Sequence, residues 1–329
     1  MKQSVRYLPV GLFGAVMGLC GLVLSARAAA TALPGTVRAP AYFTEPWGAL
    51  GALAFALLFP AYVAKWIRYP DDARAEFTDP ARLGWCGALP VGMTLLAGAI
   101  APYLTTLADA IWCSAVALLF LYQVWGIVRL LQGGIDLAQV NGAWMILFIG
   151  GIVVPGGGIA LGHEEIARAL FGLSAAATPF VMGLIFYRAV IGPPLPETAR
   201  AGWFIFLVPP SLIYAHGLTF FGEFVFLENL FFFATLLAVA LLVYARNFLR
   251  WPFGATWWAF TFPLDAYAFA AARYAQSHPE PLWKGVAAAA LAVATLFVAL
   301  VLVKTLVALA RGELLAPAAT PRSAASRAA

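Results

Sequence analysis

Two ionisable side chains lie inside long apolar stretches and close to prolines. Asp265 follows Pro263 by two residues, and His216 follows Pro210 by six. Ionisable groups at such positions are costly, so they usually have a function or a partner. Two interpretations are open: Asp265 and His216 bind a proton during coupled transport, or they are local hydrogen-bond partners for backbone groups that the prolines free. The second interpretation is the simpler one.

Other groups of reactive residues give no catalytic pattern. His163-Glu164-Glu165 lies at a predicted helix start, where glutamate suits the helix dipole. The run Gly156-Gly157-Gly158 lacks the Gly-Lys-Ser/Thr ending of a phosphate-binding loop. Neither the three histidines nor the three cysteines have metal-ligand spacing. We therefore expect no enzyme, no cofactor and no metal site.

The amino-acid composition indicates which class of protein contains these residues. Of 329 residues, 63% are hydrophobic and 11% are charged, against roughly 25% charged in a soluble domain. The sequence therefore predicts an all-α integral membrane protein. The net charge of +5 does not point to nucleic acid, because the basic residues lie between apolar runs and set topology.

A window of about twenty residues, the length that crosses a bilayer, finds ten predicted membrane spans. Lys2 and Arg6 before the first span imitate a secretory signal, but Pro9 and the glycines that follow favour a retained helix. The spans are 8–26, 46–67, 83–103, 107–131, 140–162, 166–190, 202–220, 225–246, 255–274 and 284–310. They form one predicted channel domain, 1–315, followed by a disordered cytoplasmic tail, 316–329.

The basic residues predict orientation. When loops are assigned alternately to two sides, one side holds only five of the twenty lysines and arginines, namely Arg27, Arg38, Arg168, Arg273 and Lys284. The side with more basic residues is cytoplasmic. We therefore expect a multi-pass protein of a bacterial inner (plasma) membrane, with both termini in the cytoplasm.

Every second predicted span contains proline or several glycines. Such helices are tolerated where their backbone meets protein or water rather than lipid. The alternation predicts five helical hairpins in a pseudo-fivefold ring, with the kinked odd spans around a central pore. Pro60 and Pro179 are exceptions in even spans. The expected kinks are at Pro9, Pro90, Pro155, Pro209, Pro210 and Pro263.

Residues near these kinks are the predicted lining of the pore. They are apolar, so the pore would lack a strong ion-binding site and would close by an aromatic side chain or by dewetting. The candidates are Phe13, Met17, Met93, Leu96, Phe148, Ile152, Phe206, Ile213, Phe262 and Phe269.

The string Trp257-Trp258-Ala259-Phe260-Thr261-Phe262-Pro263-Leu264 resembles the tellurite-resistance/dicarboxylate transporter family. This family includes bacterial tellurite-resistance protein A and the plant slow-type anion channels. The glycine-rich first span and Val208-Pro209-Pro210-Ser211 look like the same family. The resemblance implies a five-hairpin pore and a homotrimer with one pore in each subunit. It also implies a phenylalanine that blocks the pore, at Phe262 by motif, with Phe260 as the second choice.

The apolar lining and the family resemblance favour an anion channel that passes small monovalent anions such as chloride or nitrate. The main alternative is a secondary carrier of dicarboxylates, sulfite or tellurite-related oxyanions, in which Asp265 or His216 takes a proton. A membrane assembly without transport is a third possibility. The expected partners are inorganic or carboxylate anions, the lipid bilayer and further copies of the chain.

Overall fold

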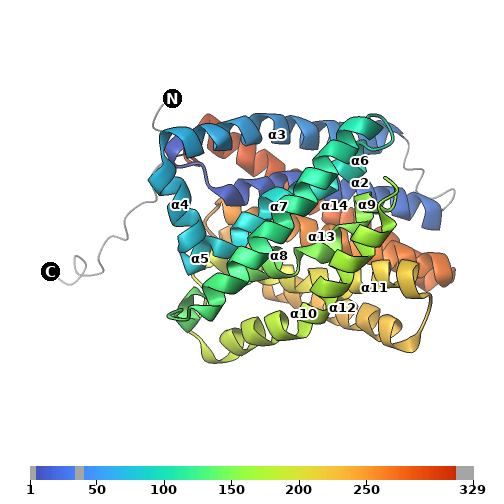
Figure 1. Cartoon of the computed structure of the whole chain (residues 1–329). Coiled ribbons are helices and arrows are strands. Elements are labelled where there is room, and N and C mark those ends of the chain that lie inside the picture. Colours follow the sequence, from blue (N-terminus) through green and yellow to red (C-terminus); the bar gives the residue numbers. More distant parts are fainter. Residues whose placement is uncertain (1–4, 34–40, 316–329) are drawn as a thin grey trace.

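The structure is a computed structural model that describes residues 5–33 and 41–315. All regular secondary structure in these two ranges is helical, as predicted (Figure 1). The predicted tail, 316–329, lies outside the described residues. The long helices are α2 (Gly14–Ala32), α3 (Ala41–Arg68), α6 (Ala88–Ile100), α7 (Thr105–Leu131), α10 (Glu164–Ile191), α11 (Val208–Phe221), α12 (Val225–Tyr244), α13 (Trp258–Ser277) and α14 (Pro281–Ala310).

Within the described residues, eight helical stretches are long and apolar enough to cross a membrane. They correspond to eight of the ten predicted spans. The predicted span 140–162 is instead divided into short pieces, α8 (Trp144–Phe148), η4 (Gly150–Val153) and α9 (Pro155–Gly158). The predicted span 255–274 corresponds to α13, which is long enough but made less apolar by Asp265, Arg273 and Gln276.

Burial divides the eight stretches into two groups. Val10–Ala32, Pro80–Ile100 and Glu197–Phe221 are 83%, 89% and 72% buried, whereas the other five are between 11% and 39% buried. Most of α13 and all of α8 are also buried. The odd segments of the chain therefore form the interior, and the even helices cover them.

The five buried segments contact one another in cyclic order. We call them the first (Val10–Ala32), third (Pro80–Ile100), fifth (144–158), seventh (Glu197–Phe221) and ninth (255–277) segments. The first packs on the third, the third on the fifth, the fifth on the seventh, the seventh on the ninth and the ninth on the first.

Each buried segment contains a 3₁₀ stretch followed by α-helix. The 3₁₀ stretches are η1 (Val10–Phe13), η2 (Gly84–Gly87), η4, η5 (Glu197–Leu207) and η7 (Ala255–Trp257). In the first, third, seventh and ninth segments the α-helix begins at the next residue, and in the fifth only Val154 intervenes. A 3₁₀ run of eleven residues, as in η5, is unusually long. The repeated change of helix type is a fivefold feature that the sequence did not reveal.

The prolines of the buried segments have different positions relative to these changes of helix type. Pro9 precedes η1, and Pro209 and Pro210 occupy the first turn of α11, where a missing N–H costs little. The expected kink at Pro209 and Pro210 is therefore a helix start, and the interruption precedes it in η5. Pro263 lies inside α13, which continues through it.

Glycines allow α2 and α13 to approach each other closely. A Cβ atom on Gly18 would lie 2.2 Å from the Thr261 hydroxyl oxygen, and one on Gly14 would lie 2.9 Å from Trp258 Cβ. A Cβ on Gly21 would lie 3.0 Å from both Phe262 and Asp265. Small residues spaced in this way let membrane helices pack backbone to backbone. We call the contact of Gly14, Gly18 and Gly21 with α13 the glycine seam.

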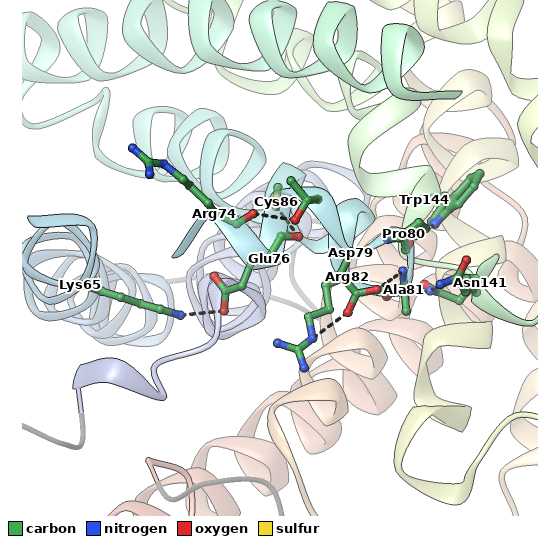
Figure 2. A network of polar contacts seen from close by, with 12 residues as sticks. Lys65, Arg74, Glu76, Asp79, Pro80, Ala81, Arg82, Cys86, Asn141 and Trp144 are labelled. Carbon is green, nitrogen blue, oxygen red and sulfur yellow. Dashed lines mark hydrogen bonds and ion pairs between the residues drawn. The ribbon is translucent and has the colours of Figure 1, made fainter. Parts of the chain in front are cut away.

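A buried ion pair holds the start of the first segment. Lys65 Nζ lies 2.8 Å from Glu76 Oε1, and it also donates to the Leu8 carbonyl at 2.7 Å. Tyr62 donates its hydroxyl proton to the other oxygen of Glu76. Figure 2 shows Lys65 and Glu76 pointing toward each other between α3 and α4 (Pro70–Thr78). The ion pair therefore ties α3 and α4 to the chain that leads into η1.

A second group of contacts in Figure 2 joins the third and fifth segments. Trp144 donates its indole N–H to the Pro80 carbonyl at 2.9 Å, and Asn141 donates to the Ala81 carbonyl at 2.9 Å. Asp79 caps the short helix α5 (Pro80–Leu83) by accepting from the Ala81 amide. These bonds fix where the broken fifth segment begins.

We expect Gly18→Ala to destabilise the protein by about 1–3 kcal/mol, because the new methyl group overpacks the glycine seam at Thr261. Thermal unfolding in detergent measures this loss. Gly183→Ala is the matched control, since a Cβ at Gly183 meets no atom within 4 Å. Equal unfolding temperatures for the two variants would contradict the packing argument.

Lys65→Met should lower the free energy of unfolding by about 3 kcal/mol, because it leaves the buried Glu76 carboxylate without its cation. Chemical or thermal unfolding reports the change. Arg74→Gln serves as the control, because the Arg74–Asp71 pair is exposed and 3.6 Å apart, and such pairs contribute little. A loss no larger than that of the control would show that the buried pair does not anchor this end of the fold.

Candidate functional site: two cavities separated by Phe262

An apolar cavity of about 30 Å³ lies among the five buried segments. It is placed at the changes from 3₁₀ to α-helix: Gly14, Val208 and Trp258 begin their helices, and Ile152 and Val153 end η4. All five buried segments contribute to it. The other lining residues are Met17, Trp85, Val91, Met145, Ile146, Ile149, Gly150, Ile205, Pro209, Ala259, Phe262 and Pro263.

A second, polar cavity of about 350 Å³ lies toward the C-terminal ends of the same segments. All five segments line it too. Its polar lining comprises Arg27, Thr31, His216, Asp265, Arg273 and Gln276, and its apolar lining comprises Gly21, Leu24, Ala28, Leu95, Val153, Gly156, Leu212, Phe262, Ala266 and Phe269.

Phe262 and Val153 line both cavities. The Phe262 side chain lies against Gly21 of the glycine seam, where a Cβ would be 3.0 Å from its ring. Phe262 is 5% exposed. One aromatic side chain from the ninth segment and one valine from the fifth therefore lie between the two cavities.

Hydrogen bonds hold the arginines of the polar cavity. Arg27 donates to the carbonyls of Gly98 and Ala99 at 3.2 and 2.8 Å, near the end of α6. Arg273 donates to Gln276 and Thr219 at 3.3 and 3.5 Å. Neither arginine is recorded in an ion pair among the described residues. The polar cavity thus has two fixed positive charges near its wall.

Asp265 and His216 are buried in the same wall. Neither carboxylate oxygen of Asp265 has a hydrogen-bond partner among the described residues. The His216 ring lies 5.5 Å from the Phe269 ring, centroid to centroid, and 6.4 Å from that of Phe171. The two ionisable groups picked out from the sequence therefore line one cavity, and the structure gives Asp265 no local backbone partner.

The structure places the predicted lining residues in two groups. Met17, Ile152, Phe262 and Phe269 line one or both cavities. Phe13, Phe148 and Phe260 were expected to line the pore, but they line neither cavity. Each of their rings packs outward instead. Phe13 contacts Phe55 and Tyr62 of α3.

Phe260 belongs to a buried aromatic cluster with Phe204, Phe248 and Phe297, and Phe148 faces Gly126 of α7. Met93, Leu96, Phe206 and Ile213 also lie outside the lining of the two cavities.

Sequence reasoning missed several lining residues that a helical period would have found. Positions 258, 262, 265, 269, 273 and 276 of α13 recur every three or four residues and all line the cavities. Positions 14, 17, 21, 24, 28 and 31 of α2 do the same. Both sets form one stripe along a helix. Trp85, Met145 and Ile205 lie in or near 3₁₀ stretches, where this period does not apply.

The amino-acid sequence matches a known protein family over most of its length. A model of the family described as voltage-dependent anion channel, SLAC1, matches residues 7–306. The chain belongs to this anion channel family. The match runs through all five buried segments.

Plant and archaeal proteins of known sequence are similar to this member of the SLAC1 family. The guard cell S-type anion channel SLAC1 of Arabidopsis thaliana is 25% identical over 74% of this chain and 45% of its own length. The S-type anion channel SLAH3 of the same plant is 23% identical over 92% of this chain and 48% of its own length. An uncharacterized transporter of Methanocaldococcus jannaschii is 22% identical over 65% of this chain and 70% of its own length. The chain spans about half the length of the two plant relatives.

The separation of the cavities can be measured by cysteine labelling in a Cys113→Ser background, since Cys20 and Cys86 are buried. A water-soluble thiol reagent added from the polar-cavity side should label Thr31→Cys quickly and Met17→Cys slowly. Adding Phe262→Ala should raise the Met17→Cys rate at least tenfold. Ala272→Cys, buried on α13 away from both cavities, should stay unreactive. Fast labelling of Met17→Cys with Phe262 intact would contradict the barrier.

Proposed function

We propose that this protein is an anion channel whose conduction path joins the apolar and polar cavities and is closed by Phe262. The observation that carries the proposal is the position of Phe262 in the walls of both cavities, each of which is lined by all five buried segments. The path runs down the middle of one chain. Small monovalent anions such as chloride and nitrate are the proposed substrates.

The charge distribution supports an anion rather than a cation. Arg27 and Arg273 line the polar cavity and attract anions into it, because positive charge in a confined space raises their local concentration. The first residues of α2, α11 and α13 line the apolar cavity, but their amides already donate to the preceding 3₁₀ stretches. The two arginines therefore supply the positive charge. The apolar cavity offers no strong binding group, so an anion that enters can also leave.

The proposed assembly and orientation follow from the sequence and the family. The ten predicted spans cross a bacterial inner membrane with both termini in the cytoplasm, which puts the polar cavity on the outer side. The even helices expose apolar side chains such as Leu57, Leu121 and Phe180, which suits contact with lipid or with another copy. A homotrimer with one pore per subunit fits a path formed within a single chain.

A second candidate function is proton-coupled transport of a weak acid, such as a dicarboxylate, sulfite or a tellurite-related oxyanion. Asp265 favours it, because both of its oxygens are buried without a partner among the described residues and it lines the polar cavity. A carboxyl group in this position is able to bind a proton within the path. His216, in the same wall, is the second proposed proton site.

Removing the Phe262 ring should open the path. In planar bilayers, Phe262→Ala is expected to raise chloride and nitrate current at least tenfold over wild type, because the two cavities become continuous. Phe269→Ala is the matched control: this phenylalanine is on the same helix and lines only the polar cavity, so its removal should leave the current near wild type.

The two candidate functions give different results in the same preparation. A channel gives current that follows the anion gradient and is unaffected by a pH gradient. No current from Phe262→Ala, together with carboxylate uptake into vesicles that a pH gradient drives and Asp265→Asn abolishes, would overturn the channel and establish the carrier.

A further inference from the structure

Three potential metal ligands of different chemistry meet where the fifth segment turns into α10. Asp109 and Cys113 lie one helical turn apart on α7, so both point from the same face. His163 precedes α10 by one residue. The Asp109 carboxylate, the Cys113 sulfur and the His163 imidazole nitrogen all lie within 4.8 Å of one another.

The distances suit a transition metal after small side-chain movements. His163 Nε2 lies 2.5 Å from Asp109 Oδ1 and 3.8 Å from Cys113 Sγ. Around a tetrahedral zinc ion with bonds of about 2.0–2.3 Å, ligand atoms are about 3.3–3.7 Å apart. The Asp109 side chain is 46% exposed, so its carboxylate is free to move away from His163 by the distance required.

The neighbouring residues hold the histidine in place. The His163 ring stacks on the buried Trp112 ring, with 4.8 Å between centroids and 5° between planes. Gly162, at φ +85°, makes the turn that brings His163 back to α7. The amide of His163 donates to the Gly158 carbonyl at 2.8 Å. The imidazole is therefore positioned before any ligand arrives.

We propose that Asp109, Cys113 and His163 form a binding site for one zinc-class transition-metal ion, which nothing in the family resemblance implies. Thiolate and imidazole ligands select zinc, cadmium, cobalt or copper over magnesium and calcium. Three protein ligands leave the fourth position of a tetrahedral ion to water. No local sequence pattern marks this site, because His163 lies fifty residues from Cys113.

The same group of residues reaches the proposed pore. Trp112 donates its indole N–H to the Val154 carbonyl at 3.2 Å, and Val153 is the fifth segment's part of the barrier between the cavities. Trp112 also packs so closely on Gly158 that a Cβ there would lie 2.4 Å from its ring. A metal ion bound to His163 therefore acts on the stacked Trp112 ring and, through it, on the fifth segment. This second step rests on the proposed channel function, whereas metal binding does not.

Cobalt titration of the purified, reduced protein tests the binding step. One Co²⁺ per chain should produce the near-ultraviolet absorption of a cobalt–thiolate bond, and zinc should displace it. Cys113→Ser should abolish this absorption, and His163→Gln should weaken binding at least tenfold. Glu165→Gln, an exposed acidic neighbour, is the control and should bind as wild type does.

Thermal unfolding without metal separates loss of the site from loss of the fold, and Asp109→Asn provides a third variant if one of the others unfolds. Absence of the thiolate absorption in wild type, or its persistence in Cys113→Ser, would overturn the site.

For the second step, zinc should change anion flux in Phe262→Ala vesicles but not after Cys113→Ser is added. Trp112→Phe should retain cobalt binding and reduce the zinc effect. An unchanged zinc effect in Trp112→Phe would overturn the proposed coupling from the metal site through Trp112 to the fifth segment, but not the metal site itself.

Discussion

The close contact between α2 and α13 determines the position of the residues around the proposed path. Gly14, Gly18 and Gly21 have no side chain between the two helix backbones, so α13 lies against α2 over two turns. That contact sets the depth at which the Phe262 ring lies. It also buries Asp265 against Gly21. The Phe262 ring, the buried Asp265 carboxyl group and the two helices therefore form a single packed unit, and a substitution at one of these glycines changes the packing around Phe262.

Around this unit, five unlike sequences adopt one structural pattern. Each buried segment changes from 3₁₀ to α-helix within the apolar cavity or beside it, although the residues at the change differ: Gly14 in the first segment, Val208 in the seventh and Trp258 in the ninth. Proline is at the change only in the fifth and seventh segments. The repeat is therefore one of backbone geometry and packing rather than of residue type.

Composition predicted which segments are buried, because proline and glycine mark backbones that meet protein rather than lipid. It could not predict how each segment is rotated. Phe260 and Phe262 are two residues apart, yet one packs among outer aromatics and the other lies between the cavities. The resemblance at α13 selected Phe262, which lines both cavities. His163 meets Asp109 and Cys113 only through packing of distant segments, so no spacing in the sequence could reveal the three together.

The two kinds of helix in each buried segment have a mechanical consequence. A residue in 3₁₀ geometry advances the chain by about 2.0 Å and turns it by about 120°, against about 1.5 Å and 100° in an α-helix. Converting one residue at the boundary from 3₁₀ to α-helix therefore shortens the segment by about 0.5 Å and rotates the residues beyond it by about 20°. A shift of this boundary therefore couples translation along each buried segment to rotation about its axis. In the ninth segment Phe262 lies one turn beyond the boundary, so such a shift would turn its ring relative to the two cavities.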